Sequence, residues 1–74
     1  MNRLIIDVEE TSGLLRCRKA EVYELLESGE LPAYREGSRW KIPLSTLERY
    51  VEERAISEAR ARRLAAKGEE DEEA

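Results

Sequence analysis

The sequence contains no histidine, no phenylalanine and a single cysteine among its 74 residues. A lone cysteine cannot close an intramolecular disulfide, which favours a reducing compartment. Without histidine it also lacks a partner for a metal site and a general base for nucleophilic chemistry. A glycine-rich loop of the kind that cradles phosphate is missing as well. These absences predict that the chain is not an enzyme and that it carries no cofactor and no metal.

Long apolar runs are also missing. No run approaches the roughly 18 apolar residues that a membrane span requires. The first residues include Arg3 and Asp7, where a secretory signal peptide would place a long apolar segment. We therefore expect a cytoplasmic protein with no membrane partner, and its length supports one small domain.

Charged residues make up 41% of the chain, and the net charge of −4 argues at first against nucleic acid as a partner. Five of the acids, however, form an uninterrupted run at residues 69–73. Without that run, 13 basic residues remain against 12 acidic ones, and the net charge is +1. The local clustering of charge therefore has to decide which partner the chain binds.

The first half of the sequence predicts a short strand and two helices. Residues 4–6 are β-prone, and Asp7 with Glu10 forms a capping box that opens a helix over residues 8–15. Residues 16–18 leave room only for a tight turn before a second helix over residues 19–28. That helix should bury a stripe of apolar side chains and end at a glycine in the left-handed region: Val22, Leu25, Leu26 and Gly29.

A β-hairpin is predicted over residues 33–42, around a glycine-containing turn. Side chains alternate between the two faces of a strand. Trp40 and Ile42 should therefore face the core, while Arg39 and Lys41 share the opposite face. Pro43 should end the hairpin.

A third helix should begin at residues 45–48, where Ser-Thr-Leu-Glu reads as a second capping box. Residues 55–67 are rich in strong helix formers and predict that this helix continues until Gly68, with Glu58 and Arg62 as an ion pair one turn apart. Its inward face should consist of three apolar or aromatic side chains: Leu47, Tyr50 and Val51.

The predicted order is strand, helix, turn, helix, hairpin and helix. This order indicates a mainly α fold with a small β-hairpin wing, a winged helix-turn-helix with three helices, the third extended. We divide the chain into a DNA-binding domain at residues 1–54, a helical extension at 55–68 and a disordered acidic tail at 69–74.

Three stretches, residues 7–10, 21–35 and 37–43, carry a resemblance to a known family, and two passages within them are specific as a pair. These passages are Ser-Gly-Glu-Leu-Pro-Ala at residues 28–33 and Gly-Ser-Arg-Trp-Lys-Ile-Pro at residues 37–43. With them, the chain over about residues 4–52 resembles the excisionase (recombination directionality factor) family, relatives of the MerR-type winged-helix proteins. It departs from that family at Arg18, where a small polar helix cap is common, and at Glu24 and Glu27, where members often carry a basic residue.

The resemblance implies a sequence-specific DNA-binding accessory protein. Such a protein binds and bends attachment-site DNA, directs an integrase or recombinase of a bacteriophage or mobile element toward excision, and binds side by side on repeated sites. A small transcriptional regulator of the same fold is an alternative. A winged-helix module that binds protein instead of DNA is another, supported by the acidic second helix and tail.

The candidate DNA-binding residues form three groups, for each of which ordinary surface charge or a place at the core margin is the competing interpretation. The first group lies on the hairpin, the second at the turn and helix start, and the third on the second helix, where an acid could accept from cytosine. The groups are Arg35, Ser38, Arg39 and Lys41; Arg16, Arg18 and Lys19; and Glu21, Tyr23 and Glu24. The extended third helix could add DNA contacts through its arginines or remain solvated, but we favour a partner protein as its contact.

Overall fold

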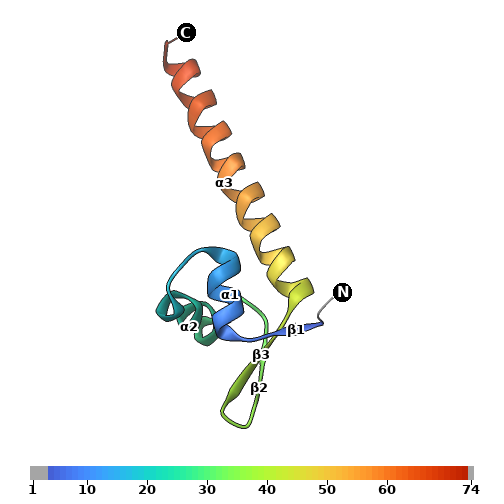
Figure 1. Ribbon diagram of the computed structural model, residues 1–74. Coiled ribbons are helices and arrows are strands. Elements are labelled where there is room, and N and C mark those ends of the chain that lie inside the picture. The colour runs from blue at the N-terminus through green and yellow to red at the C-terminus, as the bar shows by residue number, and fades with distance from the viewer. Residues whose placement is uncertain (1–3, 74) are drawn as a thin grey trace.

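The structure is a computed structural model that describes the backbone of residues 4–73 and the side chains of residues 4–66. Three helices and three short strands form the winged helix-turn-helix that the sequence predicts (Figure 1). In chain order the elements are β1 (Ile5–Ile6), α1 (Val8–Leu15), α2 (Lys19–Ser28), β2 (Tyr34–Glu36), β3 (Arg39–Pro43) and α3 (Leu44–Glu73).

Helix α1 begins where its sequence cap predicts. The carboxylate of Asp7 accepts from the backbone N–H of Glu10 at 2.7 Å. Inside the helix, the hydroxyl of Thr11 donates to the carbonyl of Asp7 and that of Ser12 donates to the carbonyl of Glu9, each at 2.8 Å. Both side chains are buried, and these bonds remove the cost of burying a free hydroxyl. The helix ends at Arg16, whose φ of 55° lies in the left-handed region.

Helix α2 has the bounds that the sequence predicts, although its N-cap residue is Arg18. A guanidinium has only donors and cannot accept from helix N–H groups. Instead, the carboxylate of Glu21 reaches back and accepts from the backbone N–H of Arg18 at 3.1 Å. Gly29, with a φ of 84°, ends the helix in the left-handed conformation that glycine adopts without strain.

The three strands form one antiparallel sheet in the order β1-β3-β2, so the hairpin predicted from the sequence gains β1 as a third strand. Ile6 lies opposite Ile42, which joins the N-terminal segment to the hairpin. In the hairpin, which we call the wing, Arg35 lies opposite Trp40. The sheet therefore fixes the wing against the helical body.

The core is small and aliphatic. Ile42 of β3, Val22 of α2 and Leu31 are almost fully buried, and Trp40 and Tyr50 are half-buried against them. The alternation predicted for β3 is confirmed for Ile42, which is buried, and for Arg39, which is exposed, whereas Lys41 is half-buried like Trp40. The remaining buried apolar side chains are Ile6, Leu26 and Leu47. One core prediction is wrong: Val51 remains 47% exposed.

Helix α3 differs from the prediction at its start. It begins at Leu44, directly after β3, and not behind a cap at Ser45. The backbone N–H of Leu44 donates to the carbonyl of Leu4 at 3.0 Å, so the N-terminal segment occupies the first orphan donor of the helix. The hydroxyl of Thr46 donates to the carbonyls of Pro43 and Pro32 and joins the helix start to the loop after α2.

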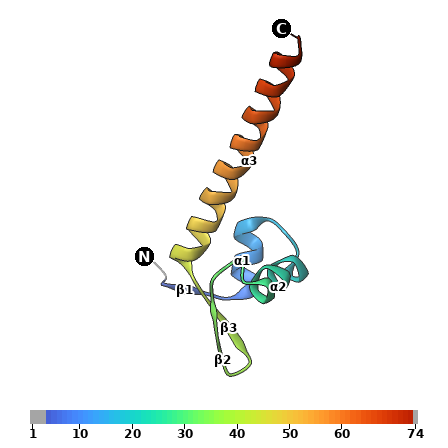
Figure 2. The same ribbon diagram turned by 180° about the vertical axis from the view of Figure 1, so that it is seen from behind.

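The end of α3 differs as well. We expected the helix to end at Gly68, but it continues to Glu73, through residues that we expected to lack regular structure; Ala74 lies outside the described residues. A single glycine costs a helix only about 1 kcal/mol, and strong helix formers stand on both sides of it. Both views show α3 leaving the body at the end opposite to the tip of the wing (Figures 1 and 2).

Candidate nucleic-acid interface

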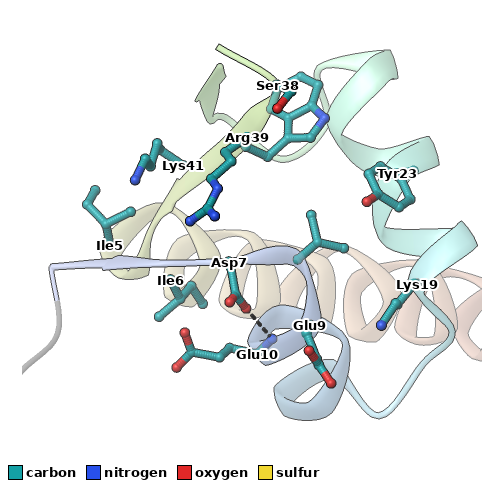
Figure 3. A pocket seen from close by; sticks show the side chains of 12 residues that line it. Ile5, Ile6, Asp7, Glu9, Glu10, Lys19, Tyr23, Ser38, Arg39 and Lys41 are labelled. Carbon is teal, nitrogen blue, oxygen red and sulfur yellow. Dashed lines mark hydrogen bonds between the residues drawn. The ribbon is translucent and has the colours of Figure 1, made fainter. Parts of the chain in front are cut away.

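A cavity of about 590 Å³ lies between α2, the wing and the start of α1. We call it the wing cavity. Lys19 enters it from α2, while Arg39 and Lys41 enter it from β3 (Figure 3). Tyr23 and Ser38 add a hydroxyl from each side. Cations and hydrogen-bond donors thus line both walls of one cavity, as contact with a phosphate backbone requires.

Two sides of α2 line two different cavities. Lys19 and Tyr23, four residues apart, share the side that lines the wing cavity. Glu21 and Glu24 line a different groove, between α2 and α3. The structure therefore places the two acids on a different side of α2 from Lys19 and Tyr23. Their contact with DNA stays a prediction.

The wing also has two faces, and its arginines divide between them. Residues directly opposite in an antiparallel pair share a face, so Arg35 lies on the side of Trp40. The guanidinium carbon of Arg35 stands 5.4 Å from the centre of the Trp40 ring, within the range of a cation–π contact. Arg39 and Lys41 lie on the other face. Arg35 is consequently placed as a packing partner of Trp40.

The two arginines of the turn lie outside the wing cavity. Arg16 and Arg18 are both exposed, on either side of Cys17, which is half-buried against the core. Of the ten candidate residues, the structure brings five together around the wing cavity: Lys19, Tyr23, Ser38, Arg39 and Lys41. The DNA-binding role of all ten stays a prediction.

Sequence reasoning missed three acids that line the same cavity: Asp7, Glu9 and Glu10. They stand at the start of α1, where the helix dipole favours negative charge. The sequence therefore indicated a role in helix capping for these acids and no place in the site. Figure 3 shows them across the cavity from the wing. Their three negative charges equal in number the positive charges of Lys19, Arg39 and Lys41, and they oppose the approach of phosphate to the cavity.

Within the described part of the chain, no three histidine, cysteine or acidic side chains gather as a metal ion would require. None of the described helices is long and apolar enough to cross a membrane.

Comparison with known proteins identifies the family. Residues 5–55 match the model of the helix-turn-helix domain. The chain is 37% identical, over 60 residues, to the uncharacterized protein YvgK of Bacillus subtilis (strain 168), a match that covers 81% of this chain and 20% of that relative. The chain thus spans about a fifth of the length of the relative that it matches. No solved structure matches the chain. The matched region contains α1, the turn, α2 and the wing, and the chain belongs to the helix-turn-helix domain family.

Proposed function

We propose that the chain binds double-stranded DNA in a sequence-specific manner, with α2 in the major groove and the wing along the adjacent groove or backbone. Membership of the helix-turn-helix domain family supports this function, because the second helix of that motif is the one that reads base edges. The winged arrangement supports it further, since the wing extends the contact beyond one groove.

The observation that carries the proposal is the position of the cations on two walls of the wing cavity. Lys19 stands at the start of α2, where backbone N–H groups and the helix dipole also attract phosphate. Arg39 and Lys41 come from the neighbouring strand β3. A duplex that lies across α2 and the wing meets positive charge from both, and phosphate contacts supply most of the affinity of such proteins.

The finer function that we propose is that of an accessory protein, an excisionase that bends attachment-site DNA and directs an integrase toward excision. The resemblance of residues 28–33 and 37–43 to the excisionase family supports it. One module of this size covers roughly 600–1,000 Å² of protein surface on DNA, which limits the affinity of a single copy. Neighbouring copies or the integrase would add the missing binding energy through effective concentration. In this role the chain acts by binding and catalyses no reaction.

The test is the salt dependence of binding to duplex DNA, followed by fluorescence anisotropy. If the wing and turn neutralise about four phosphates, log K should fall against log[salt] with a slope of roughly −3.6. A flat salt response, or no binding at low salt, contradicts DNA binding. An in vitro excision assay with the integrase and its attachment sites then tests the finer function, because a transcriptional regulator would leave the direction of recombination unchanged.

A further inference from the structure

A second groove, of about 480 Å³, lies between α2 and α3, on the side of α2 that carries Glu21 and Glu24. We call it the α2–α3 groove. All three helices contribute to its apolar lining, with Leu15 from α1, Leu25 from α2 and Val51 from α3. Leu15 and Leu25 are half-buried and Val51 is 47% exposed, so the lining is accessible to a side chain from outside. The groove thus offers apolar surface next to two acids.

Arg54 is the one cation among the described residues that line the groove, and its charge is already paired. It donates to the carboxylate of Glu58 at 2.9 Å and to the hydroxyl of Tyr50 at 3.0 Å. These contacts raise the pKa of Arg54, first through the hydrogen bond with Glu58. Glu58 therefore pairs with the arginine one turn before it, and not with Arg62 as predicted.

Negative charge continues beyond the groove. Glu30 and Glu53 line a shallow hollow that shares Tyr50 and Arg54 with it. The arginines of the turn line neither the groove nor the hollow. Glu24 makes no hydrogen bond or ion pair with another described residue, so its charge is available to a partner. The surroundings of the groove therefore favour an occupant that is basic and carries apolar side chains.

The exposed side of α3 beside the groove suits a helix as the occupant. Val51 and Ala55, four residues apart, lie on one side of α3, and both are exposed. The small side chain of Ala55 lets a second helix pack close to α3. The chain's own arginine-rich stretch does not provide that helix. At about 100° per residue, Arg60, Arg62 and Arg63 point to different sides of α3 and form no single basic face, so a different protein has to supply it.

We propose that the α2–α3 groove binds an amphipathic helix of a partner protein, one that carries arginine or lysine beside its apolar side. Such a helix lays its apolar side into a groove. Here that side covers Leu25 and Val51, and the cations approach Glu24. Leu25 lies about 160° around α2 from Tyr23, so this partner and a duplex at the wing cavity approach α2 from different sides. The partner site goes beyond the proposed DNA binding and does not rest on it.

A synthetic peptide tests the groove in the absence of DNA. The probe is a fluorescently labelled helix of leucine and arginine whose leucines all lie on one side. Anisotropy at low salt should show that it binds the full chain, and its affinity should fall as salt screens the exposed ion pairs. A peptide of the same composition with its leucines spread around the helix should bind about fivefold more weakly, because it offers no apolar side. Amide NMR shifts should be largest at Leu15, Leu25 and Val51 and small in the wing.

Two matched pairs of variants separate the groove from the rest of the surface. Val51→Ser removes apolar lining and should weaken binding of the peptide about fivefold. Ile56→Ser is its control, because Ile56 is a similarly exposed apolar residue of α3 that does not line the groove, and it should have little effect. Glu24→Gln should weaken binding about threefold at low salt. Glu27→Gln is its control, because Glu27 is an exposed acid of α2 outside the groove. Circular dichroism of each variant checks that the chain remains folded.

Four results would overturn the proposal. The first is a wild-type chain that does not bind the amphipathic peptide at low salt. The second is equal affinity for the two peptides, which would show that charge alone attracts them. The third is an equal effect of Val51→Ser and Ile56→Ser. The fourth is a set of groove amide shifts that grow with the concentration of the chain alone, which would make a second copy the occupant.

Discussion

Neighbouring side chains on α2 differ in role because they face different surroundings. Lys19 and Tyr23 line the wing cavity, whereas Glu24 lines the α2–α3 groove. Glu21 completes the helix cap that Arg18 cannot provide. Between Arg18 and Glu27 the chain carries two cations and three acids. Glu21 and Glu24 line a different groove, so their charges do not stand beside Lys19 in the wing cavity.

Two arginines of the wing provide a matched comparison. Arg39→Ala should weaken binding to every duplex and flatten the salt slope by about 0.9, the share of one phosphate contact. Arg35→Ala should change the slope less, because the Arg35 side chain lies over Trp40 and does not itself line the wing cavity. Anisotropy titrations of both variants over a salt series measure the difference. Equal loss of slope in the two would show that the wing contacts DNA from both faces.

Glu24 gives a prediction about base recognition. Glu24→Ala should leave the preference among duplex sequences unchanged, because this side chain lines the α2–α3 groove and not the wing cavity. Binding would be compared on a set of duplexes that differ at single base pairs. A loss of preference at one C·G pair would restore the cytosine contact that the residue type first suggested.

The part of the site that could be predicted follows from strand alternation. Arg39 and Lys41 share a face because they are two residues apart on β3, and the sequence alone indicates this. Helix geometry alone places Glu24 about 100° around α2 from Tyr23, but the surface that each side chain faces could not be predicted in the same way. It depends on which side of α2 the helix α3 packs against, and that is a tertiary contact between segments more than 20 residues apart.

At the scale of elements, local capping residues correctly predicted the bounds of α1 and α2. Asp7 caps α1 and Gly29 ends α2, and both helices have their predicted bounds. Ser45 carried an equally good cap signal but lies inside α3. The carbonyl of Leu4, 40 residues away in the chain, accepts the N–H of Leu44 and lets the helix begin earlier. A local capping pattern contains no information on that partner.

The cap of α1 gives a stability prediction. Asp7→Ala should lower the free energy of unfolding by about 1 kcal/mol, because the N–H of Glu10 loses its acceptor. Asp7→Asn should cost much less, since asparagine caps helices about as well as aspartate. Urea denaturation measures both. An equal loss of stability in the two variants would show that the hydrogen bond of the cap does not stabilise the helix.

Asp7→Asn has a second use, because Asp7 also lines the wing cavity. Removal of its charge with the cap retained should raise affinity for duplex DNA at low salt, since one repulsive carboxylate leaves the cavity. The gain should disappear at high salt, where exposed charges are screened. Anisotropy at two salt concentrations measures it, and Glu53→Gln, an exposed acid that does not line the cavity, is the control. An equal gain in the control would mean that only net charge matters.

At the scale of the whole molecule, the charge of the chain is distributed along its length. The principal extents are 58 × 26 × 18 Å, and α3 accounts for the long dimension (Figure 1). The wing lies at one end and the acidic residues 69–73 lie at the other. The net charge of −4 therefore describes no single surface of the protein. The end that is proposed to meet DNA and the end that carries the acidic run are electrostatically separate.

This separation predicts the effect of removing the acidic end. From Leu44 to residue 69 the helix rises roughly 38 Å, which is several times the Debye length of about 8 Å at physiological salt. Deletion of residues 69–74 should therefore leave both DNA affinity and salt slope nearly unchanged at physiological salt, and it should leave the folded body intact. Replacement of residues 69–73 by glutamine is the control, because it removes the charge and keeps the length. Anisotropy and thermal unfolding of the three proteins test this. Tighter binding by the truncated and the glutamine-substituted proteins alike would show that the acids reach the wing cavity, which a continuous α3 does not permit within one copy.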